Sequence, residues 1–286
     1  MKKTWIVSVL ILTVLLSMTS LSSGEEKFDG VYGKGANRFS LATGSPGELG
    51  LVKALGDRFT AGTDTTLLWK KAGSGESLKA LQDKSADMIM VHAPAAEKKA
   101  VADGWAIKRT LIGSNEFFIV GPLDDPAKIS QATSAADAYS KIASAKAKFM
   151  SRGDNSGTHK KEMDIWKKAG LTPSGDWYVV TRDYMIATLK RAEAEKGYFM
   201  TDSSTWVAEK KKAPGLKILF QGDKFLVNTY HALCQPEKAT PGAEWAARFI
   251  DFVASDEGQK IIRDYGREAH GEGLYNDAVY AKKYDD

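Results

Sequence analysis

Short apolar runs alternate along the chain with segments in which apolar residues recur every three or four positions. The run 39–42 predicts a strand, and Leu49, Val52, Leu55 and Phe59 predict a helix over 46–59 with one buried face. The same pattern predicts further strands at 65–69, 87–91, 116–120, 148–151, 177–180, 198–201, 216–220 and 225–233, and helices at 76–82, 135–145, 157–169, 184–195, 243–253 and 256–265. This alternation indicates an α/β fold with mixed, mostly parallel sheets flanked by helices.

The series of strands and helices is interrupted twice. Gly121-Pro122 ends its first half, and a turn at 221–223 precedes the last strand. Two arrangements fit this order: two consecutive domains, or a middle lobe, 122–224, inserted into a first lobe made of 38–121 and 225–286. The inserted arrangement places two chain crossings and a cleft between the lobes. Ligands of open α/β sheets bind outside the carboxyl ends of the strands, so the turns that follow strands are the candidate sites.

The N-terminus has the pattern of a secretory signal. Lys2 and Lys3 precede an apolar run over 5–18, and the small residues of Ser20-Leu21-Ser22 follow it. The run has about fourteen residues, fewer than the roughly twenty of a bilayer-spanning helix. We therefore expect a cleaved signal peptide over 1–22 and a mature chain in the periplasm. Because no cysteine stands beside the cleavage site, we expect no lipid anchor.

The composition argues against several other classes of protein. The net charge is +4 and both signs are scattered along the chain, so we expect no nucleic-acid partner. Cys234 is the single cysteine, and the four histidines lack metal-binding spacing, so we expect no protein-bound metal. The glycines of 73–75 fall short of a dinucleotide fingerprint because Leu78 stands where its third glycine belongs, and we expect no cofactor.

Four turns at helix starts share one kind of chemistry. Each carries hydroxyl side chains, glycines or an arginine where backbone N–H groups have no intrahelical partner and the helix dipole is positive. Each turn alone is ordinary helix capping, but together the four could enclose a small anion in a cleft. The turns are 43–48, 73–77, 151–158 and 181–185.

Three strings carry a resemblance to a known family. The segments 87–97 (DMIMVHAPAAE), 151–162 (SRGDNSGTHKKE) and 197–205 (GYFMTDSST) resemble the tungstate-binding periplasmic proteins of ABC importers, the TupA family. The resemblance extends from Phe39 to Asn276. It implies a two-lobed type II periplasmic binding protein fold that closes on a tetrahedral oxyanion, and tungstate is the oxyanion we expect. An ABC permease in the cytoplasmic membrane is the implied partner, and we expect a monomer that is not an enzyme.

The four turns and the resemblance together give the expected ligand set. Three departures from the family pattern leave the oxyanion open. The first turn, 42–46, has Ala-Thr-Gly-Ser-Pro in place of the family's run of threonines and a serine, Arg182-Asp183 stands where the family has glycines, and Ser203 stands where it has arginine. We also expect Glu76 and Asp154 to point away or cap backbone N–H groups, since carboxylates would repel an anion. The ligand residues are Thr43, Gly44, Ser45, Ser74, Gly75, Arg152, Ser156, Gly157, Thr158, Tyr184 and Met185.

Alternative functions remain open at this point. The ligand could be molybdate, another oxyanion or a small organic anion. A larger organic ligand would need an apolar slot lined by Tyr184 and Trp206. An enzyme on the same fold would need a base such as His159 or Asp202 facing the cleft.

Overall fold

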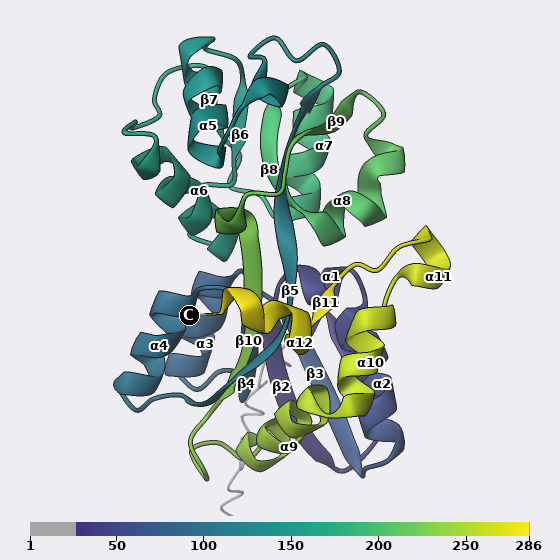
Figure 1. Ribbon diagram of the computed structural model, residues 1–286. Helices are drawn as coiled ribbons and strands as arrows, with labels where there is room; N and C mark the ends of the chain where they lie inside the picture. Colours follow the sequence, from purple (N-terminus) through teal and green to yellow (C-terminus); the bar gives the residue numbers. More distant parts are fainter. Residues whose placement is uncertain (1–26, 286) are drawn as a thin grey trace, which may run out of the picture.

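The computed structural model describes residues 27–285, which form two lobes stacked end to end (Figure 1). Their strands form one mixed sheet within the described residues, in the order β1-β3-β2-β4-β10-β5-β8-β6-β7, with β9 and β11 also paired to β5. The α/β prediction is confirmed. The expected signal peptide, 1–22, lies outside the described residues. No helix within 27–285 is long and apolar enough to cross a membrane.

The first lobe contains β1 (Gly30–Gly33), β2 (Asn37–Thr43), β3 (Thr65–Lys71) and β4 (Met88–Val91). β2 runs parallel to β3 and β4, and β1 is antiparallel to β3. Because side chains alternate between the faces of a strand, Leu41 packs in one hydrophobic cluster and Ala42 in another. The helices over the two faces are α2 (Leu51–Ala61), α9 (Ala243–Ala254) and α10 (Asp256–Asp264) on the first, and α3 (Ser74–Gln82) and α4 (Pro94–Ala102) on the second.

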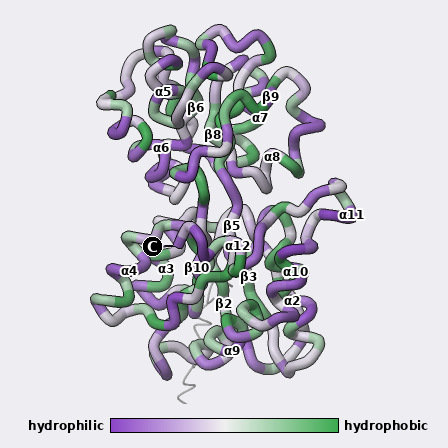
Figure 2. Tube along the Cα trace, viewed as in Figure 1, coloured by the Kyte–Doolittle hydropathy of each residue, from purple (hydrophilic) through white to green (hydrophobic). Residues whose placement is uncertain are grey.

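The second lobe has a separate hydrophobic core. Its centre is aromatic: the ring centroid of Trp166 lies 4.3 Å from that of Tyr139 and 5.3 Å from that of Phe149. Its strands are β6 (Phe149–Ser151), β7 (Tyr178–Val180), β8 (Tyr198–Asp202) and β9 (Leu216–Phe220), and its helices are α5 (Ala135–Ser144), α6 (Gly157–Lys168), α7 (Met185–Glu195) and α8 (Ser203–Glu209). Along the outer helices of both lobes, hydrophobic and hydrophilic residues alternate, as helices with one buried face require (Figure 2).

Two long strands, β5 (Ile107–Pro122) and β10 (Val227–Cys234), pass between the lobes (Figure 1). The first part of β5 pairs with β10 up to the Glu116–Val227 pair, and from Phe117 it pairs with β8. β5 therefore changes its pairing partner from β10 to β8 between Glu116 and Phe117. Gly121-Pro122 ends the strand within the second lobe, because Gly121 and Pro122 still pair with β9.

The predicted helix over 46–59 is in fact two helices. α1 (Ser45–Glu48) ends before Gly50, whose φ of 87° is left-handed, and α2 starts at Leu51. Glycine adopts this conformation without the steric cost that other residues pay.

The sequence analysis did not predict several short elements. They are the strands and helices β1, α4, α8, α11 (Arg267–His270), β11 (Asn276–Asp277) and α12 (Ala278–Ala281), and the 3₁₀ turns η1 (Ile129–Gln131), η2 (Lys210–Lys212), η3 (Lys224–Leu226) and η4 (Lys282–Tyr284).

Candidate functional site

A small closed cavity of about 20 Å³ lies between the lobes, where the carboxyl ends of strands face helix starts. A cavity of this size suits one compact ion, whereas sites for organic ligands of drug size usually measure roughly 300–1,000 Å³. Both lobes supply its walls. The lining residues are Thr43, Gly44, Ser45, Pro46, Glu48, Ala72, Gly73, Ser74, Met90, His92, Arg152, Ser156, Tyr184 and Tyr230.

The wall from the first lobe is built mainly of uncharged groups. Thr43 ends β2 and is fully buried, and its hydroxyl donates to the Met90 carbonyl at 2.7 Å. Ser45 and Ser74 are the first residues of α1 and α3, so their backbone N–H groups belong to the unpaired first turns of those helices. Glu48 is the charged residue of this wall, and its carboxylate is 2.5 Å from the Lys71 ammonium.

The wall from the second lobe carries the cation. Arg152 follows β6 and is 4% exposed, and its Nη2 donates to Asp154 Oδ2 at 2.5 Å. Its Nε is buried and has no hydrogen-bond partner among the described residues. The Thr158 hydroxyl, in the first turn of α6, is likewise buried without a partner within 27–285. Buried unpaired donors are costly unless a ligand accepts from them.

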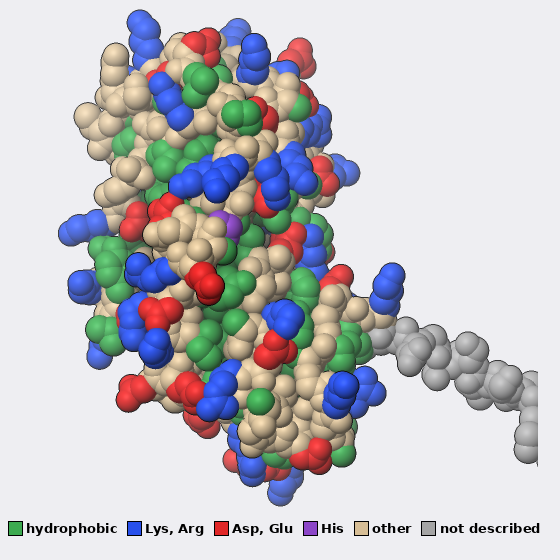
Figure 3. Space-filling model, turned by 90° about the vertical axis from the view of Figure 1, so that its right-hand side faces the viewer, with side chains coloured by type: hydrophobic (Ala, Val, Ile, Leu, Met, Phe, Trp, Pro, Cys, Tyr) green, Lys and Arg blue, Asp and Glu red, His purple; other side chains and the backbone are tan. Residues whose placement is uncertain are grey.

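Carboxylates near the cavity bind backbone N–H groups, as expected. Glu76 Oε2 accepts from Gly73 N at 3.0 Å, which is the half of a capping box that the third residue of α3 supplies. Asp154 Oδ1 accepts from Ser156 N at 3.1 Å. Both side chains therefore stabilise the turns that carry the donors. On the face shown in Figure 3, Lys and Arg side chains are interspersed with Asp and Glu side chains.

Contacts between the lobes hold the cavity closed. The Tyr184 hydroxyl donates to Glu76 Oε2 at 3.1 Å, and the Lys71 ammonium lies 4.1 Å from the centre of the Tyr184 ring. The Ser45 hydroxyl donates to Asp202 Oδ2 at 3.4 Å. Tyr184, the N-cap residue of α7, thus joins the second lobe to the start of α3.

Two of the predicted glycines serve the contact between the lobes. Neither Gly75 nor Gly157 is among the residues that line the cavity. A Cβ at Gly75 would lie 2.7 Å from the Asn155 carbonyl oxygen, and one at Gly157 would lie 2.5 Å from His92 Nδ1. Real Cβ atoms essentially never come this close. A side chain at either position would therefore hold the two walls apart.

Some of the other predicted residues line the cavity and others do not. Thr43, Gly44, Ser45, Ser74, Arg152, Ser156 and Tyr184 line the cavity. The side chain of Met185 is 2% exposed and packs in the second core, and Met185 is not among the residues that line the cavity. Trp206 packs in the same core, so it does not form an apolar slot together with Tyr184. Arg182 is exposed and does not line the cavity.

Sequence reasoning missed His92 and Tyr230. His92 directly follows β4, which is the position where ligands of α/β sheets bind, and this was the available signal. The pKa of His92 is lowered to about 3 because the ring is buried and Arg152 is nearby. The imidazole is therefore neutral at ordinary pH. Tyr230 lies on β10 with its ring centroid 4.9 Å from that of His92, and no local pattern pointed to it.

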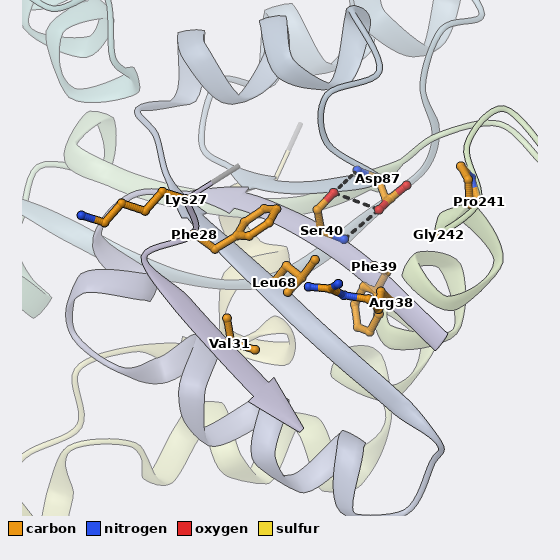
Figure 4. Close-up of a pocket in the computed structure, with 10 residues that line it drawn as sticks. All are labelled: Lys27, Phe28, Val31, Arg38, Phe39, Ser40, Leu68, Asp87, Pro241 and Gly242. Atoms are coloured by element: carbon orange, nitrogen blue, oxygen red, sulfur yellow. Dashed lines mark hydrogen bonds between the residues drawn. The ribbon is translucent and has the colours of Figure 1, made fainter. Parts of the chain in front are cut away.

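A larger hollow of about 700 Å³ lies elsewhere on the first lobe (Figure 4). Lys27, Phe28 and Val31 line one part of it, and the start of β2 and Gly242 line another. Its carboxylate, Asp87, accepts from the backbone N–H of Ser40 at 2.7 Å and from its hydroxyl at 2.9 Å. This hollow is open and does not gather unpaired donors, so the small cavity remains the candidate site.

The two α/β lobes are joined by two strands and enclose a cavity at the starts of α1, α3, α6 and α7. This arrangement defines a two-lobed solute-binding protein. The matching family model is the PBP superfamily domain, over residues 30–257. The tungstate-binding protein TupA of Peptoclostridium acidaminophilum is 33% identical over 282 residues, which cover 96% of this chain and 98% of the relative. This chain belongs to the TupA family within the PBP superfamily.

Solved structures agree with this assignment. The crystal structure of the tungstate ABC transporter from Geobacter sulfurreducens matches with a TM-score of 0.73 and 38% identity, covering 81% of this chain and 100% of that one. The tungstate-binding protein TupA from Desulfovibrio alaskensis G20 matches with a TM-score of 0.69 and 36% identity, covering 85% of this chain and 99% of that one. The first of these structures is named as a tungstate ABC transporter and the second as a tungstate-binding protein.

Proposed function

We propose that this protein captures tungstate in the cavity between its lobes and delivers it to an ABC permease in the cytoplasmic membrane. The observation that carries the proposal is the buried, unpaired Nε of Arg152 in the wall of a cavity of ionic size. Thr158 Oγ1, in the first turn of α6, is also a buried, unpaired donor, although Thr158 is not among the residues that line the cavity. Helix starts from both lobes add backbone N–H groups and positive dipole ends. An unprotonated oxyanion accepts at every oxygen and therefore matches a site built largely of donors.

The donors can account for tight binding without a large net charge. A hydrogen bond to a charged group contributes roughly 1.5–3 kcal/mol net, so on the order of six to eight such bonds are sufficient for about −12 kcal/mol, a nanomolar Kd. Arg152 adds the fork-shaped guanidinium that suits an oxyanion. Its partner Asp154 keeps the site close to neutral, so that fixed dipoles supply most of the attraction.

The same geometry favours transport over catalysis. His159 Nδ1 accepts from Asn155 N at 3.0 Å, and Asp202 accepts from Thr205 N at 2.8 Å as the cap of α8. Both candidate bases are therefore occupied by local hydrogen bonds. The proposed location is the periplasm, on the basis of the leader pattern over 1–22 and the relatives' membership of ABC transport systems.

Calorimetric titration of the mature protein with tungstate, molybdate, sulfate and phosphate tests this function. Sulfate and phosphate have shorter bonds to oxygen, so a cage spaced for tungstate stretches two or three donor contacts at roughly 1.5–3 kcal/mol each. We expect tight tungstate binding, competition by molybdate and discrimination of several powers of ten against the smaller ions. Sulfate or phosphate binding as tight as tungstate binding would contradict the proposal.

A further inference from the structure

His92 presents an unsatisfied nitrogen at the wall of the cavity. The residue lines the cavity, and its ring lies against Gly157, the first residue of α6. Nδ1 is buried and has no hydrogen-bond partner among the described residues. The side chain of Asn228 acts on the ring and raises the pKa of His92. Since Nδ1 has no partner, we assign this interaction to Nε2.

A chain of buried side chains along the crossing strands determines the direction of that interaction. Asp202 accepts from the hydroxyl groups of Ser204 and Thr205, so its carboxylate is the accepting end of the chain. Asn115 Nδ2 donates toward Ser204 Oγ at 2.9 Å, and Asn115 Oδ1 therefore accepts from Asn228 Nδ2 at 2.8 Å. The atom of Asn228 that remains for His92 is its carbonyl oxygen, Oδ1.

The order of donors and acceptors defines the tautomer of His92. Because Asn228 Oδ1 can only accept, His92 Nε2 carries the proton and donates it. Nδ1 of the neutral ring is then an acceptor at the cavity wall. An acceptor lone pair opposite an oxyanion oxygen is repulsive unless a proton lies between them. The ring of the free protein stays neutral because burial and the charges of Arg152 and Lys161 lower its pKa to about 3, although Asp154 acts in the opposite direction.

We propose that oxyanion capture is linked to the uptake of one proton, held between His92 Nδ1 and an oxygen of the bound ion. The inference depends on the proposed function, because it concerns the same cavity. The proton comes from solvent, and no covalent bond other than the one to this proton forms or breaks. A dianion beside the ring favours the protonated state, which offsets the depression seen in the free protein. Asn115 and Asn228 are positioning residues, since they act on the ligand only through His92.

The linkage has a defined sign. The bound ion raises the pKa of His92 above its value in the free protein, so the complex holds more protons than the separated partners. Tungstate affinity should therefore fall as pH rises toward the pKa of the complex, by up to about tenfold per pH unit. Above that pKa the affinity should no longer depend on pH.

Calorimetry in two buffers of different ionisation enthalpy, neither of them an oxyanion, counts the protons taken up per tungstate bound. At about pH 6 we expect uptake approaching one proton in the wild type and none in His92→Asn, whose amide retains a donor near the Nδ1 position but does not titrate. His270→Gln, which removes an exposed histidine of α11, is the matched control and should take up protons like the wild type. Equal uptake in the wild type and His92→Asn, or none in either, would overturn the inference. Failure of the wild type to bind tungstate at all would instead overturn the proposed function.

Nitrogen-15 NMR of labelled histidines tests the positioning residues separately. The His92 signals, assigned by their loss in His92→Asn, should show a protonated Nε2 and a bare Nδ1 in the free wild-type protein, and two protonated nitrogens with tungstate bound. Asn228→Ala should give a mixture of tautomers in the free protein. If Asn228→Ala leaves the tautomer unchanged, or if free wild-type His92 carries its proton on Nδ1, the chain from Asp202 does not control the ring.

Discussion

The two walls of the cavity offer an anion different kinds of interaction. The wall from the first lobe offers hydroxyl and backbone dipoles around Thr43, Ser45 and Ser74, and its one carboxylate is neutralised by Lys71. The wall from the second lobe places the cation Arg152 beside the start of α6. An anion on the first wall gains hydrogen bonds to neutral groups. On the second wall it also gains the charge-assisted hydrogen bonds of the Arg152 guanidinium, whose charge Asp154 balances in part. The second wall should therefore contribute more affinity per residue, and the first should contribute more to the fit of shape.

The largest effect is expected from the charged wall. Arg152→Ala should weaken tungstate binding by roughly 2–4 kcal/mol, because it removes a charge-assisted bidentate donor. Arg152→Lys should restore part of this affinity, since an ammonium lacks the planar fork. Titration calorimetry measures both variants. Arg191→Ala, which removes an exposed arginine paired with Glu195, is the control and should bind like the wild type. Unchanged affinity in Arg152→Ala would place the site elsewhere.

A second prediction concerns buried acids, which differ between the lobes. Burial raises the pKa of Glu162, in the second core, to about 7, although Tyr178 donates to it at 2.6 Å. A raised pKa stabilises the folded protein at pH values below the pKa of the unfolded state, about 4.5. This stabilisation is lost as pH rises to about 7, and the free energy of unfolding then falls by about 3 kcal/mol at most. In urea unfolding from pH 4.5 to 8, the free energy of unfolding of the wild type should fall by this amount relative to that of Glu162→Gln, in which the contribution of His92 is the same. Parallel profiles for the two proteins would contradict it.

His92 gives the opposite pH dependence on the side of the first lobe. Its pKa in the folded protein, about 3, lies below the usual 6.5, so the stability that it contributes is present above pH 6.5 and lost as pH falls toward 3. The two lobes thus lose stability from opposite ends of the pH range, and the protein should be most stable between them.

Local patterns predicted much of this arrangement. The strand, loop and capped helix of 148–169 are consecutive in the chain, so their chemistry was visible in the order of residues, and Arg152 and Ser156 do line the cavity. His92 and Tyr230 were missed because their neighbours come from distant elements, α6 and β4. The crossing at Glu116 also lacks a local signal, since β5 continues through it without a break. The packing of the Met185 side chain could not be predicted, because a helix start exposes its backbone N–H groups whichever way its side chain points.

A third prediction tests the fit between the walls. Gly75→Ala should weaken tungstate binding by about 1–3 kcal/mol, the usual cost of inserting an atom into a closely packed contact. The physical reason is the 2.7 Å approach of the new Cβ to the Asn155 backbone carbonyl, which cannot move as a side-chain end could. Small-angle scattering should show that wild type becomes more compact with tungstate and that Gly75→Ala does so less.

Gly62→Ala is the matched control for this substitution. A Cβ there would meet the Phe59 carbonyl oxygen at an ordinary 3.8 Å, away from the other lobe. Wild-type scattering that is identical with and without tungstate would contradict closure of the lobes on the ligand. Equal affinities of Gly75→Ala and Gly62→Ala would show that the close contact does not limit binding.

The smallest effect is expected from a single hydroxyl of the uncharged wall. Ser74→Ala should weaken tungstate binding by about 0.5–1.5 kcal/mol, the usual net contribution of one neutral donor. The backbone N–H groups at the start of α3 remain in this variant. The backbone N–H of His92 donates to Ser74 Oγ at 3.4 Å, which is a long hydrogen bond, so little else is lost. Titrations at two salt concentrations separate the two walls. Loss of a neutral donor should leave the salt dependence of binding unchanged, whereas Arg152→Ala should reduce it, because screening acts on charges. If Ser74→Ala costs as much affinity as Arg152→Ala, the two walls contribute alike and the distinction between them fails.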